Sequence, residues 1–296
     1  MGRLKMTNAL TVDVEDYFQV AAFSDEIQYA NWDSYQLRVE TNTNRLLDLF
    51  DAYQIKATFF ILGWVAERVP GLVRRIHDQG HEIACHGYSH QLIYKQDIKT
   101  FTDETRKAKQ ILEDISGAKV AGYRAASYSI TRDSLWALDV LNNLGFVYDS
   151  SIVPVHHDYY GIPDMPRFPY NIDTPDGNQL IEFPPSTISL PLMNLPVGGG
   201  GYFRLFPYWF TQRALHWINN HDNMPFVFYL HPWEIDIEQP RINAGLLSRF
   251  RHYNNLSKCY ERLEKLLNQF QFSTVSDVLQ GKQCKLQVAA QQVTSN

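Results

Sequence analysis

The chain has 296 residues, of which 45% are hydrophobic and 20% are charged, and its formal net charge is -5 at pH 7. This length and composition fit a globular protein with one barrel-sized domain or two smaller ones. The acidic balance leaves no basic footprint, so we expect no nucleic-acid partner. Three cysteines, an odd number, argue against a disulfide framework.

The first predicted strand lies within residues 9–16, a β-branched run that ends in three carboxylates, Asp13, Glu15 and Asp16. A buried strand has no structural need of acids at its end. The acids either cap the next segment or lie solvated in a loop, which explains one of them more easily than all three. The aromatic, irregular segment 17–35 follows, and it could line a groove.

From residue 41 the apolar spacing alternates between helical and extended periods. We expect helices at 41–53, 64–79, 97–116 and 132–144. We expect strands at 57–62, 81–85, 120–123 and 146–148. Such alternating units predict an α/β fold, in which helices cover a parallel sheet that closes or nearly closes into a barrel. An open doubly wound sheet is the alternative.

The segment 154–206 differs because proline, glycine and aspartate are frequent and helical periodicity is absent. Short strands are expected within it at 179–183 and 187–190, and a flexible loop at 198–201. We therefore expect an irregular insertion before the last barrel strand, 225–230, which is flanked by helices at 207–220 and 245–270. The predicted organisation is a single domain over 1–284 and a polar tail over 285–296.

His86 and His90 are the best candidates for metal ligands, because two imidazoles four residues apart follow an apolar run. On a helix this spacing puts both rings on one face, as in the zinc-protease pattern, but that pattern needs a glutamate directly after the first histidine. Gly87 stands there instead. We expect the pair in the turn that leaves the strand 81–85, at the end where α/β folds build their sites. A chance pair among ten histidines is the alternative.

Polar side chains follow the other predicted strands in the same way. The acids near Asp13, then Arg124, Asp149 and His231, each come just after an apolar strand. Each has a structural explanation when taken alone, such as a plain salt bridge for Arg124 or a core histidine for His231. The carboxyl ends of the strands of a barrel converge on one mouth, so together with the histidine pair these residues predict a single site.

These residues resemble the five short motifs of the polysaccharide deacetylases of carbohydrate esterase family four. The motifs occur in the family's order, as the acids within 11–16, His86 to His90, Arg124 to Tyr128, Asp149, and Leu230-His231. The early Asp-Val-Glu-Asp-Tyr-Phe and the late His-Pro-Trp-Glu are most similar to the subgroup associated with exopolysaccharide loci of exosortase-containing bacteria. The resemblance covers residues 10–235 and implies a distorted (β/α)7 barrel and a metal-dependent hydrolase that removes acetyl groups.

The resemblance also implies the catalytic roles. Asp13 would act as the general base, Arg124 would keep Asp13 ionised and oriented, and Asp149 would complete the charge network. His231 would protonate the leaving amine as the general acid, and this pairing of a base with an acid predicts a bell-shaped pH profile.

His86, His90 and one acid would bind a divalent metal, with zinc expected and cobalt or nickel as alternatives. Two neutral imidazoles and a carboxylate leave such an ion open positions for water and for the acetyl carbonyl. Which of the acids binds the metal stays open at this point. Aspartate is the usual ligand, which favours Asp16, whereas strand alternation puts Glu15 on the same side as Asp13 and favours Glu15.

The third motif departs from the family pattern Arg-x-Pro-Tyr, because Ala126 or Ser127 replaces the proline and one extra residue precedes Tyr128. We expect Ser127, Tyr128 and Trp233 to contact the substrate. Trp32, Tyr128 and Trp233 could stack on sugar rings, although in an aromatic-rich chain such rings more often belong to the core.

Three functions remain open. The leading one is N-deacetylation of an N-acetylated polysaccharide or oligosaccharide, or of its lipid-linked precursor, in exopolysaccharide or cell-envelope glycan biosynthesis. The second is hydrolysis of a small non-peptide amide, since similar barrels resemble allantoinase-like enzymes, and a narrow, lidded pocket would favour it. The third is a non-catalytic carbohydrate-binding relative, which the loss of a motif residue would favour, but Asp13, His86, His90 and His231 are all present. The sequence does not specify the sugar, the acyl group or the oligomeric state.

No apolar run reaches the length of a signal peptide or of a membrane span, so we expect a cytoplasmic protein without a transmembrane segment. A finished extracellular polymer would be an awkward substrate for such a protein. A location peripheral to the envelope is therefore the alternative.

Overall fold

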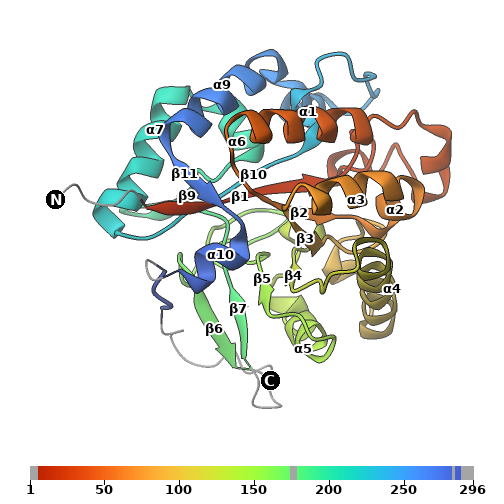
Figure 1. Ribbon diagram of the computed structural model, residues 1–296, viewed down its shortest axis with the longest axis horizontal. Coiled ribbons are helices and arrows are strands. Elements are labelled where there is room, and N and C mark those ends of the chain that lie inside the picture. The colour runs from red at the N-terminus through yellow and green to blue at the C-terminus, as the bar shows by residue number, and fades with distance from the viewer. Residues whose placement is uncertain (1–5, 174–178, 282–283, 288–296) are drawn as a thin grey trace.

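A curved, mostly parallel sheet forms the centre of the molecule, and helices lie around its outside (Figure 1). The computed structural model describes residues 6–173, 179–281 and 284–287. Among these residues the parallel strands, in their order across the sheet, are β10 (Val227–Leu230), β1 (Thr7–Val14), β2 (Thr58–Ile61), β3 (Glu82–Cys85), β4 (Gly122–Tyr123), β5 (Tyr148–Asp149) and β7 (Gln179–Glu182). Two further strands extend the sheet, β6 (Tyr170–Asp173) antiparallel to β7 and β11 (Gln271–Ser273) parallel to the start of β1.

This strand order is that of a barrel rather than of a doubly wound sheet. The strands follow one another in chain order from β1 to β7, and the last parallel strand, β10, pairs with the first. The described ladder is open between β7 and β10. The irregular segment crosses that opening, because Ser186 Oγ accepts a hydrogen bond from the Val227 N–H (2.8 Å) and the Gly198 carbonyl accepts one from the Tyr229 N–H (2.7 Å). The expected α/β fold with a distorted barrel sheet is confirmed.

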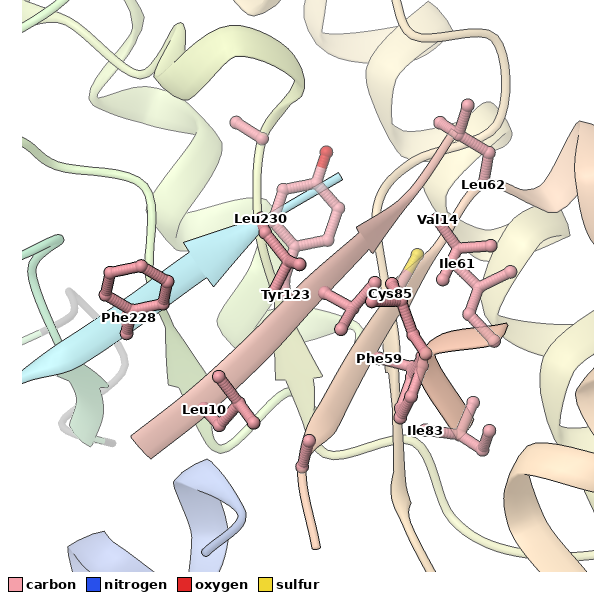
Figure 2. Close-up of a cluster of buried hydrophobic side chains, with 14 of the residues drawn as sticks. Leu10, Val14, Phe59, Ile61, Leu62, Ile83, Cys85, Tyr123, Phe228 and Leu230 are labelled. Atoms are coloured by element: carbon pink, nitrogen blue, oxygen red, sulfur yellow. The ribbon is translucent and has the colours of Figure 1, made fainter. Parts of the chain in front are cut away.

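The two faces of β1 have different neighbours, as strand alternation requires. Leu10 and Val14 point toward the helices and pack with apolar residues of the neighbouring strands, such as Ile61 and Phe228 (Figure 2). On the other face Ala9 packs in a smaller cluster that the C-terminal helix α10 (Val275–Gln280) completes. That second face leads along β1 to Asp13, so one strand contributes both to the core and to the site.

The helices confirm the predicted alternation, with three differences. In chain order they are α1 (Val39–Ala52), α2 (Gly63–Arg68), α3 (Pro70–Asp78), α4 (Ile98–Ser116), α5 (Trp136–Asn143), α6 (Gly200–Leu205), α7 (Tyr208–Trp217), α8 (Leu246–Tyr253) and α9 (Leu256–Gln269). The single helices expected at 64–79 and 245–270 are each divided. Pro70 starts a new helix because it cannot donate a backbone hydrogen bond, and Asn255 lies in the left-handed region at φ 52°.

The third difference concerns the glycine run 198–201, which was expected to be a flexible loop and instead starts α6. Gly199 lies against strand β10, with φ 132°, and a Cβ placed on it would come 1.9 Å from the Tyr229 carbonyl oxygen. Only glycine permits so close an approach. The run therefore fixes α6 against the last barrel strand.

The strands β6, β9 (Met193–Pro196) and β11 were not predicted, whereas β8 (Thr187–Leu190), the hairpin partner of β9, was. Of the expected polar tail, residues 288–296 lie outside the described part of the chain, and the division into one domain over 1–284 and a tail stays a prediction. Among the described residues no helix combines the length and the apolar character needed to cross a membrane.

A buried histidine at the start of β3 makes the stability of the fold sensitive to acid. The Nδ1 atom of His81 accepts a hydrogen bond from the Ala57 N–H (3.1 Å), and burial lowers the pKa of His81 from 6.5 to about 4. Between these two values the unfolded chain binds more protons than the folded one. The free energy of unfolding should therefore fall as the pH is lowered from 6.5 to 4, by at most about 1.4 kcal/mol per pH unit for this one group.

Chemical denaturation at pH 4.5, 5.5 and 6.5 checks this expectation against a His81→Gln variant, whose amide oxygen can accept the same hydrogen bond without titrating. The variant should show a shallower pH dependence than the natural chain. Equal slopes would contradict a role for His81.

Candidate active site

Three potential metal ligands meet at the carboxyl ends of β1 and β3. The ligand atoms of Glu15, His86 and His90 all lie within 4.8 Å of one another. The Oε2 atom of Glu15 lies 2.7 Å from the Nε2 atom of His90, yet this buried oxygen forms no hydrogen bond. A buried carboxylate oxygen without a donor is costly unless a cation is bound there. The three residues therefore fit a divalent cation by chemistry and by spacing.

The orientation of His86 leaves one nitrogen free for a ligand bond. His86 lies in the turn after β3, as the sequence predicts, and is buried. Its Nδ1 atom is 2.8 Å from the Arg124 carbonyl oxygen, and since a carbonyl only accepts, Nδ1 carries the proton and Nε2 the lone pair. Burial lowers the pKa of His86 to about 4, so the imidazole is neutral at pH 7. A neutral ring held by such a hydrogen bond is the usual form of a metal-binding histidine.

Glu15, rather than Asp16, lies beside the histidines. The carboxylate of Asp16 points the other way and accepts hydrogen bonds from the Arg38 N–H (2.7 Å) and the Val39 N–H (2.8 Å) at the start of α1. Burial raises the pKa of Asp16 to about 6, although these hydrogen bonds oppose the shift. The capping explanation therefore applies to Asp16. The geometry favours Glu15 as the metal-binding acid, in agreement with strand alternation and against the expectation of Asp16.

Neighbouring histidines keep Glu15 ionised although it is buried. Burial alone would raise the pKa of Glu15, but His90 and His231 hold it well below its usual range. An ionised oxygen is the form that a cation requires. The cluster is therefore prepared electrostatically for a positive charge.

Asp13 is paired with a completely buried arginine. The Nη1 atom of Arg124 donates to Asp13 Oδ1 (2.6 Å) and to Thr11 Oγ1 (2.8 Å). Its Nη2 and Nε atoms donate to the hydroxyl (2.9 Å) and the carbonyl (3.2 Å) of Ser150. The guanidinium group is held on two sides and leaves the second oxygen of Asp13, Oδ2, to face the rest of the site.

Asp149 lies behind this pair rather than beside the reacting groups. It accepts a hydrogen bond from the Ser151 hydroxyl (2.6 Å), which in turn accepts one from the Ala125 N–H (2.8 Å). Its carboxyl group packs against that of Glu182, and burial raises the pKa values of both acids. No hydrogen bond among the described residues joins Asp149 to His231. Asp149 therefore acts on the loop that holds Arg124, and Glu182 is a partner that the sequence did not reveal.

His231 faces the two acids across the site. Its Nε2 atom is 3.8 Å from Asp13 Oδ2 and 3.5 Å from Glu15 Oε1, and its Nδ1 atom is 2.7 Å from Glu234 Oε1. Burial alone would lower the pKa of His231, but Glu15, Glu234 and Asp13 raise it to about 9. The imidazole is therefore protonated at pH 7 and can donate a proton, in contrast to the neutral His86.

Trp233 is buried, and both of its faces are covered. Its ring stacks on His231 on one side (5.0 Å between ring centroids) and on His252 on the other (4.1 Å). Its Nε1–H donates to Glu15 Oε1 (3.1 Å). The side chain thus holds Glu15, and the contact of Trp233 with a sugar stays a prediction. Trp32, also suggested for stacking, is buried against Trp64.

Ser127 and Tyr128 form a strained turn after β4. Both have positive φ angles, 49° and 56°, which few non-glycine residues adopt. The Tyr128 hydroxyl is buried without a hydrogen bond, and its ring packs edge-on against Tyr229 (5.2 Å) and Tyr160 (6.0 Å). Ser127 is partly exposed. This turn is a wall of the site, and its contact with substrate stays a prediction.

Comparison with known families agrees with this geometry. Residues 23–148 match the family model described as polysaccharide deacetylase. These residues therefore form a polysaccharide deacetylase domain. Residues 150–280 match a second model, described as a domain of unknown function, DUF3473, which is consistent with the expected exopolysaccharide subgroup of the family.

Curated relatives match part of the chain. A peptidoglycan deacetylase of Helicobacter pylori is 32% identical over 120 residues, which are 40% of this chain and 39% of that protein. A peptidoglycan-N-acetylglucosamine deacetylase of Bacillus cereus is 37% identical over 75 residues, 25% of this chain and 27% of that protein. The matches thus span well under half the length of these relatives.

Two solved structures share the fold of the family over nearly the whole chain. A Mycobacterium smegmatis protein described as a candidate polysaccharide deacetylase superposes with a TM-score of 0.63 at 18% identity, covering 99% of this chain and 96% of that one. An allantoinase superposes with a TM-score of 0.59 at 15% identity, covering 93% of this chain and 89% of that one. The same fold therefore occurs in a protein described as a polysaccharide deacetylase and in an allantoinase. The fold alone does not distinguish a glycan substrate from a small amide.

Proposed function

We propose that this protein is a metal-dependent deacetylase that removes acetyl groups from the amino sugars of an N-acetylated polysaccharide or oligosaccharide. The observation that carries the proposal is the cluster of Glu15, His86 and His90 beside the Asp13–Arg124 pair, with His231 opposite. We further propose a role in exopolysaccharide or cell-envelope glycan biosynthesis, which the names of the curated relatives support.

Glu15, His86 and His90 would hold the metal, and zinc suits their two nitrogens and one oxygen. When bound, the ion polarises the acetyl carbonyl and makes a water molecule acidic enough to react near pH 7. The match between these residues and a cation rests on the neutral ring of His86 and on the unbonded buried oxygen of Glu15. Cobalt and nickel remain alternatives to zinc.

The protein's own groups would move the protons. Asp13 Oδ2, free of the Arg124 hydrogen bond, takes the proton of the attacking water, and Arg124 keeps Asp13 oriented through Oδ1. His231, protonated at pH 7, gives its Nε2 proton to the departing amine. Asp149 supports Arg124 through its loop. The opposed protonation states of Asp13 and His231 support general acid–base catalysis.

Acetate release tests this function. N-acetylglucosamine oligomers and allantoin would be incubated with metal-stripped protein and with zinc- or cobalt-loaded protein. The expected result is metal-dependent acetate release from the oligomers and no turnover of allantoin. Turnover of allantoin alone would assign a small-amide hydrolase, and zinc binding without any turnover would assign a non-catalytic glycan-binding relative.

The proposed substrate also suggests where in the cell the protein works. An N-acetylated envelope glycan or its precursor would place the protein at the periphery of the envelope. The cytoplasmic location expected from the sequence stays a prediction.

Replacing Trp233 by phenylalanine separates its two suggested roles. Phenylalanine keeps a ring between His231 and His252 but removes the N–H that Glu15 accepts. We expect the affinity for zinc to fall by about 10-fold, as for the loss of other hydrogen bonds to metal ligands, and KM for an N-acetylated oligomer to stay within about twofold. Titration against a chromophoric chelator and steady-state kinetics measure the two quantities. A raised KM with unchanged zinc affinity would instead favour stacking on a sugar.

A further inference from the structure

We propose that the segment of unknown function, residues 150–280, completes the active site by fixing His231 through a buried Arg204–Glu234 pair. Neither residue belongs to the five motifs that resemble the family, although Glu234 ends the His-Pro-Trp-Glu stretch that resembles the subgroup. Among the described residues no hydrogen bond joins His231 to Asp149, which was expected to complete the charge network. The inference deepens the proposed deacetylase function and rests on it. Glu234 and Arg204 are positioning residues in this scheme, since they act on the substrate only through His231.

Glu234 holds His231 at two points. Its Oε1 atom accepts hydrogen bonds from the His231 backbone N–H (3.0 Å) and from the ring Nδ1–H (2.7 Å). The short turn Pro232–Ile235 that begins after His231 brings the two residues together, with proline at its first position. With both donors on one carboxylate oxygen, the ring cannot rotate about its bond to the backbone without breaking a contact. Its Nε2 atom therefore stays directed at Asp13 and Glu15.

Arg204 holds Glu234 from the other side. Its Nε atom donates to Glu234 Oε2 (2.5 Å), and both side chains are almost completely buried, with exposed fractions of 2% and 1%. The remaining donors of the guanidinium group bind the backbone carbonyls of Arg251, His252 and Asn254 at 2.8–3.1 Å. Every hydrogen bond that the guanidinium group donates thus goes to an oxygen acceptor. Burial alone would raise the pKa of Glu234, but Arg204 and His231 lower it to about 2, so Glu234 has no proton to donate toward His231.

The position of Arg204 is itself fixed by the barrel. Arg204 lies on α6, which starts at the glycines pressed against Tyr229 of β10, and β10 leads directly into His231. Strand β10 therefore positions both residues: His231 follows it in the chain, and Arg204 lies on the helix that packs against it. This arrangement explains why the glycine run is needed, because any side chain at Gly199 would push α6 and Arg204 away from Glu234.

Each of the two matched regions contributes residues to the site, and Asp13 and Glu15 lie before both of them in the chain. Residues 23–148 contribute His86, His90 and Arg124, which face the metal and Asp13. Residues 150–280 contribute the proton donor with its positioning pair, and also Trp233, which holds Glu15. The second region is thus part of the catalytic machinery.

Replacing Glu234 by glutamine tests the proposal. Arg204 offers only donors, so the glutamine oxygen should turn toward Arg204 and its NH2 group toward His231 Nδ1, which then cannot carry a proton. In the full-length, zinc-loaded protein with 15N-labelled histidine, the His231 Nδ1–H resonance should be lost in Glu234→Gln. We expect kcat for deacetylation to fall by about 10²–10⁴-fold, with KM and zinc affinity within about threefold. Glu234→Asp should retain the resonance and part of kcat.

Asp236→Asn is the matched control. Asp236 lies two residues from Glu234 and forms a partly buried pair with an arginine, accepting hydrogen bonds from Arg38 Nε (2.5 Å) and Nη2 (2.8 Å), but no hydrogen bond joins it to His231 among the described residues. This variant should leave the His231 resonance and kcat unchanged within about twofold. If Glu234→Gln prevents folding, the double variant Arg204→Met/Glu234→Met removes both buried charges together with the acceptor of the His231 Nδ1–H, and should show the same loss of the resonance and of kcat.

A Glu234→Gln protein, or the double variant, that keeps the Nδ1–H resonance and kcat would overturn the proposal, as would an equal fall of kcat in Asp236→Asn. The resonance needs no substrate. Should the natural chain release no acetate from any glycan, the proposed deacetylase function fails while the positioning of His231 by Glu234 is still decided by the spectrum.

Discussion

Glu15→Gln is expected to lower the affinity for zinc by more than about 100-fold, whereas Asp16→Asn should leave it unchanged within about threefold. The loss of a direct ligand charge should exceed the 10- to 100-fold effect that is typical of hydrogen-bonding partners of metal ligands. Glu15 provides the carboxylate beside His86 and His90, and Asp16 instead accepts hydrogen bonds at the start of α1.

The free energy of unfolding should respond in the opposite way, with the larger loss in Asp16→Asn and little or no loss in Glu15→Gln. Asp16→Asn weakens the two backbone hydrogen bonds at the helix start, so we expect a loss of about 0.5–2 kcal/mol in the free energy of unfolding. Glu15→Gln should stabilise the metal-free protein or leave its stability unchanged, since it removes a buried charge with an unbonded oxygen. Competition with a chelator and urea denaturation of metal-free protein measure the two effects. A loss of zinc affinity in Asp16→Asn rather than in Glu15→Gln would reverse the assignment.

Asp13→Asn is expected to reduce kcat for deacetylation by about 10²–10⁴-fold, the usual contribution of a general base. The asparagine oxygen can still accept the hydrogen bond from Arg124 Nη1, so the fold and zinc affinity should persist. The structure also predicts a cost in stability of about 1–3 kcal/mol, because the buried charge of Arg124 loses its ionised partner. Steady-state kinetics of the zinc-loaded variant, combined with thermal denaturation, measure both quantities.

Asp33→Asn is the control for this substitution. Asp33 forms an ion pair of similar length with Arg68 (2.6 Å), but its side chain is 72% exposed and far from the histidines in the chain. It should change neither kcat nor stability measurably, since exposed pairs contribute little. If Asp13→Asn were inactive only because it no longer bound zinc, Asp13 would be a metal ligand rather than the base.

Much of the fold was predictable because local patterns dictate it. The apolar runs of β1, β2, β3 and β10 are buried on both faces, as strands of a helix-covered parallel sheet must be, and polar residues could follow them only at their ends. That pattern predicts that the histidine pair, the acids and His231 meet at one mouth of the barrel. In contrast, β4 and β5 are two residues long, so their register depends on neighbouring strands rather than on periodicity.

The partners of the site residues were not predictable, because they come from distant parts of the chain. Asp16 and Glu15 are neighbouring acids, and their roles depend on which segment packs against each. Asp16 caps α1 because the N–H groups of residues 38 and 39 lie beside it. Arg204 lies within a glycine-rich stretch that has the composition of a loop. Glu234 alone left a local signal, since an acid three residues after a histidine can form a reciprocal cap, which the structure contains.

The pairing of the first strand with the last barrel strand has a consequence for the order of folding. β1 carries Asp13, yet its neighbour β10 is more than 200 residues away in the chain, with Thr11 bonded to the Phe228 carbonyl across 217 residues. Contacts of such long range form late and slow the folding of a chain. During synthesis, the edge of β1 that pairs with β10 stays unpaired until residues 226–230 have left the ribosome. A chain that stops before them would therefore be expected to lack not only His231 but also protection of its first strand against aggregation.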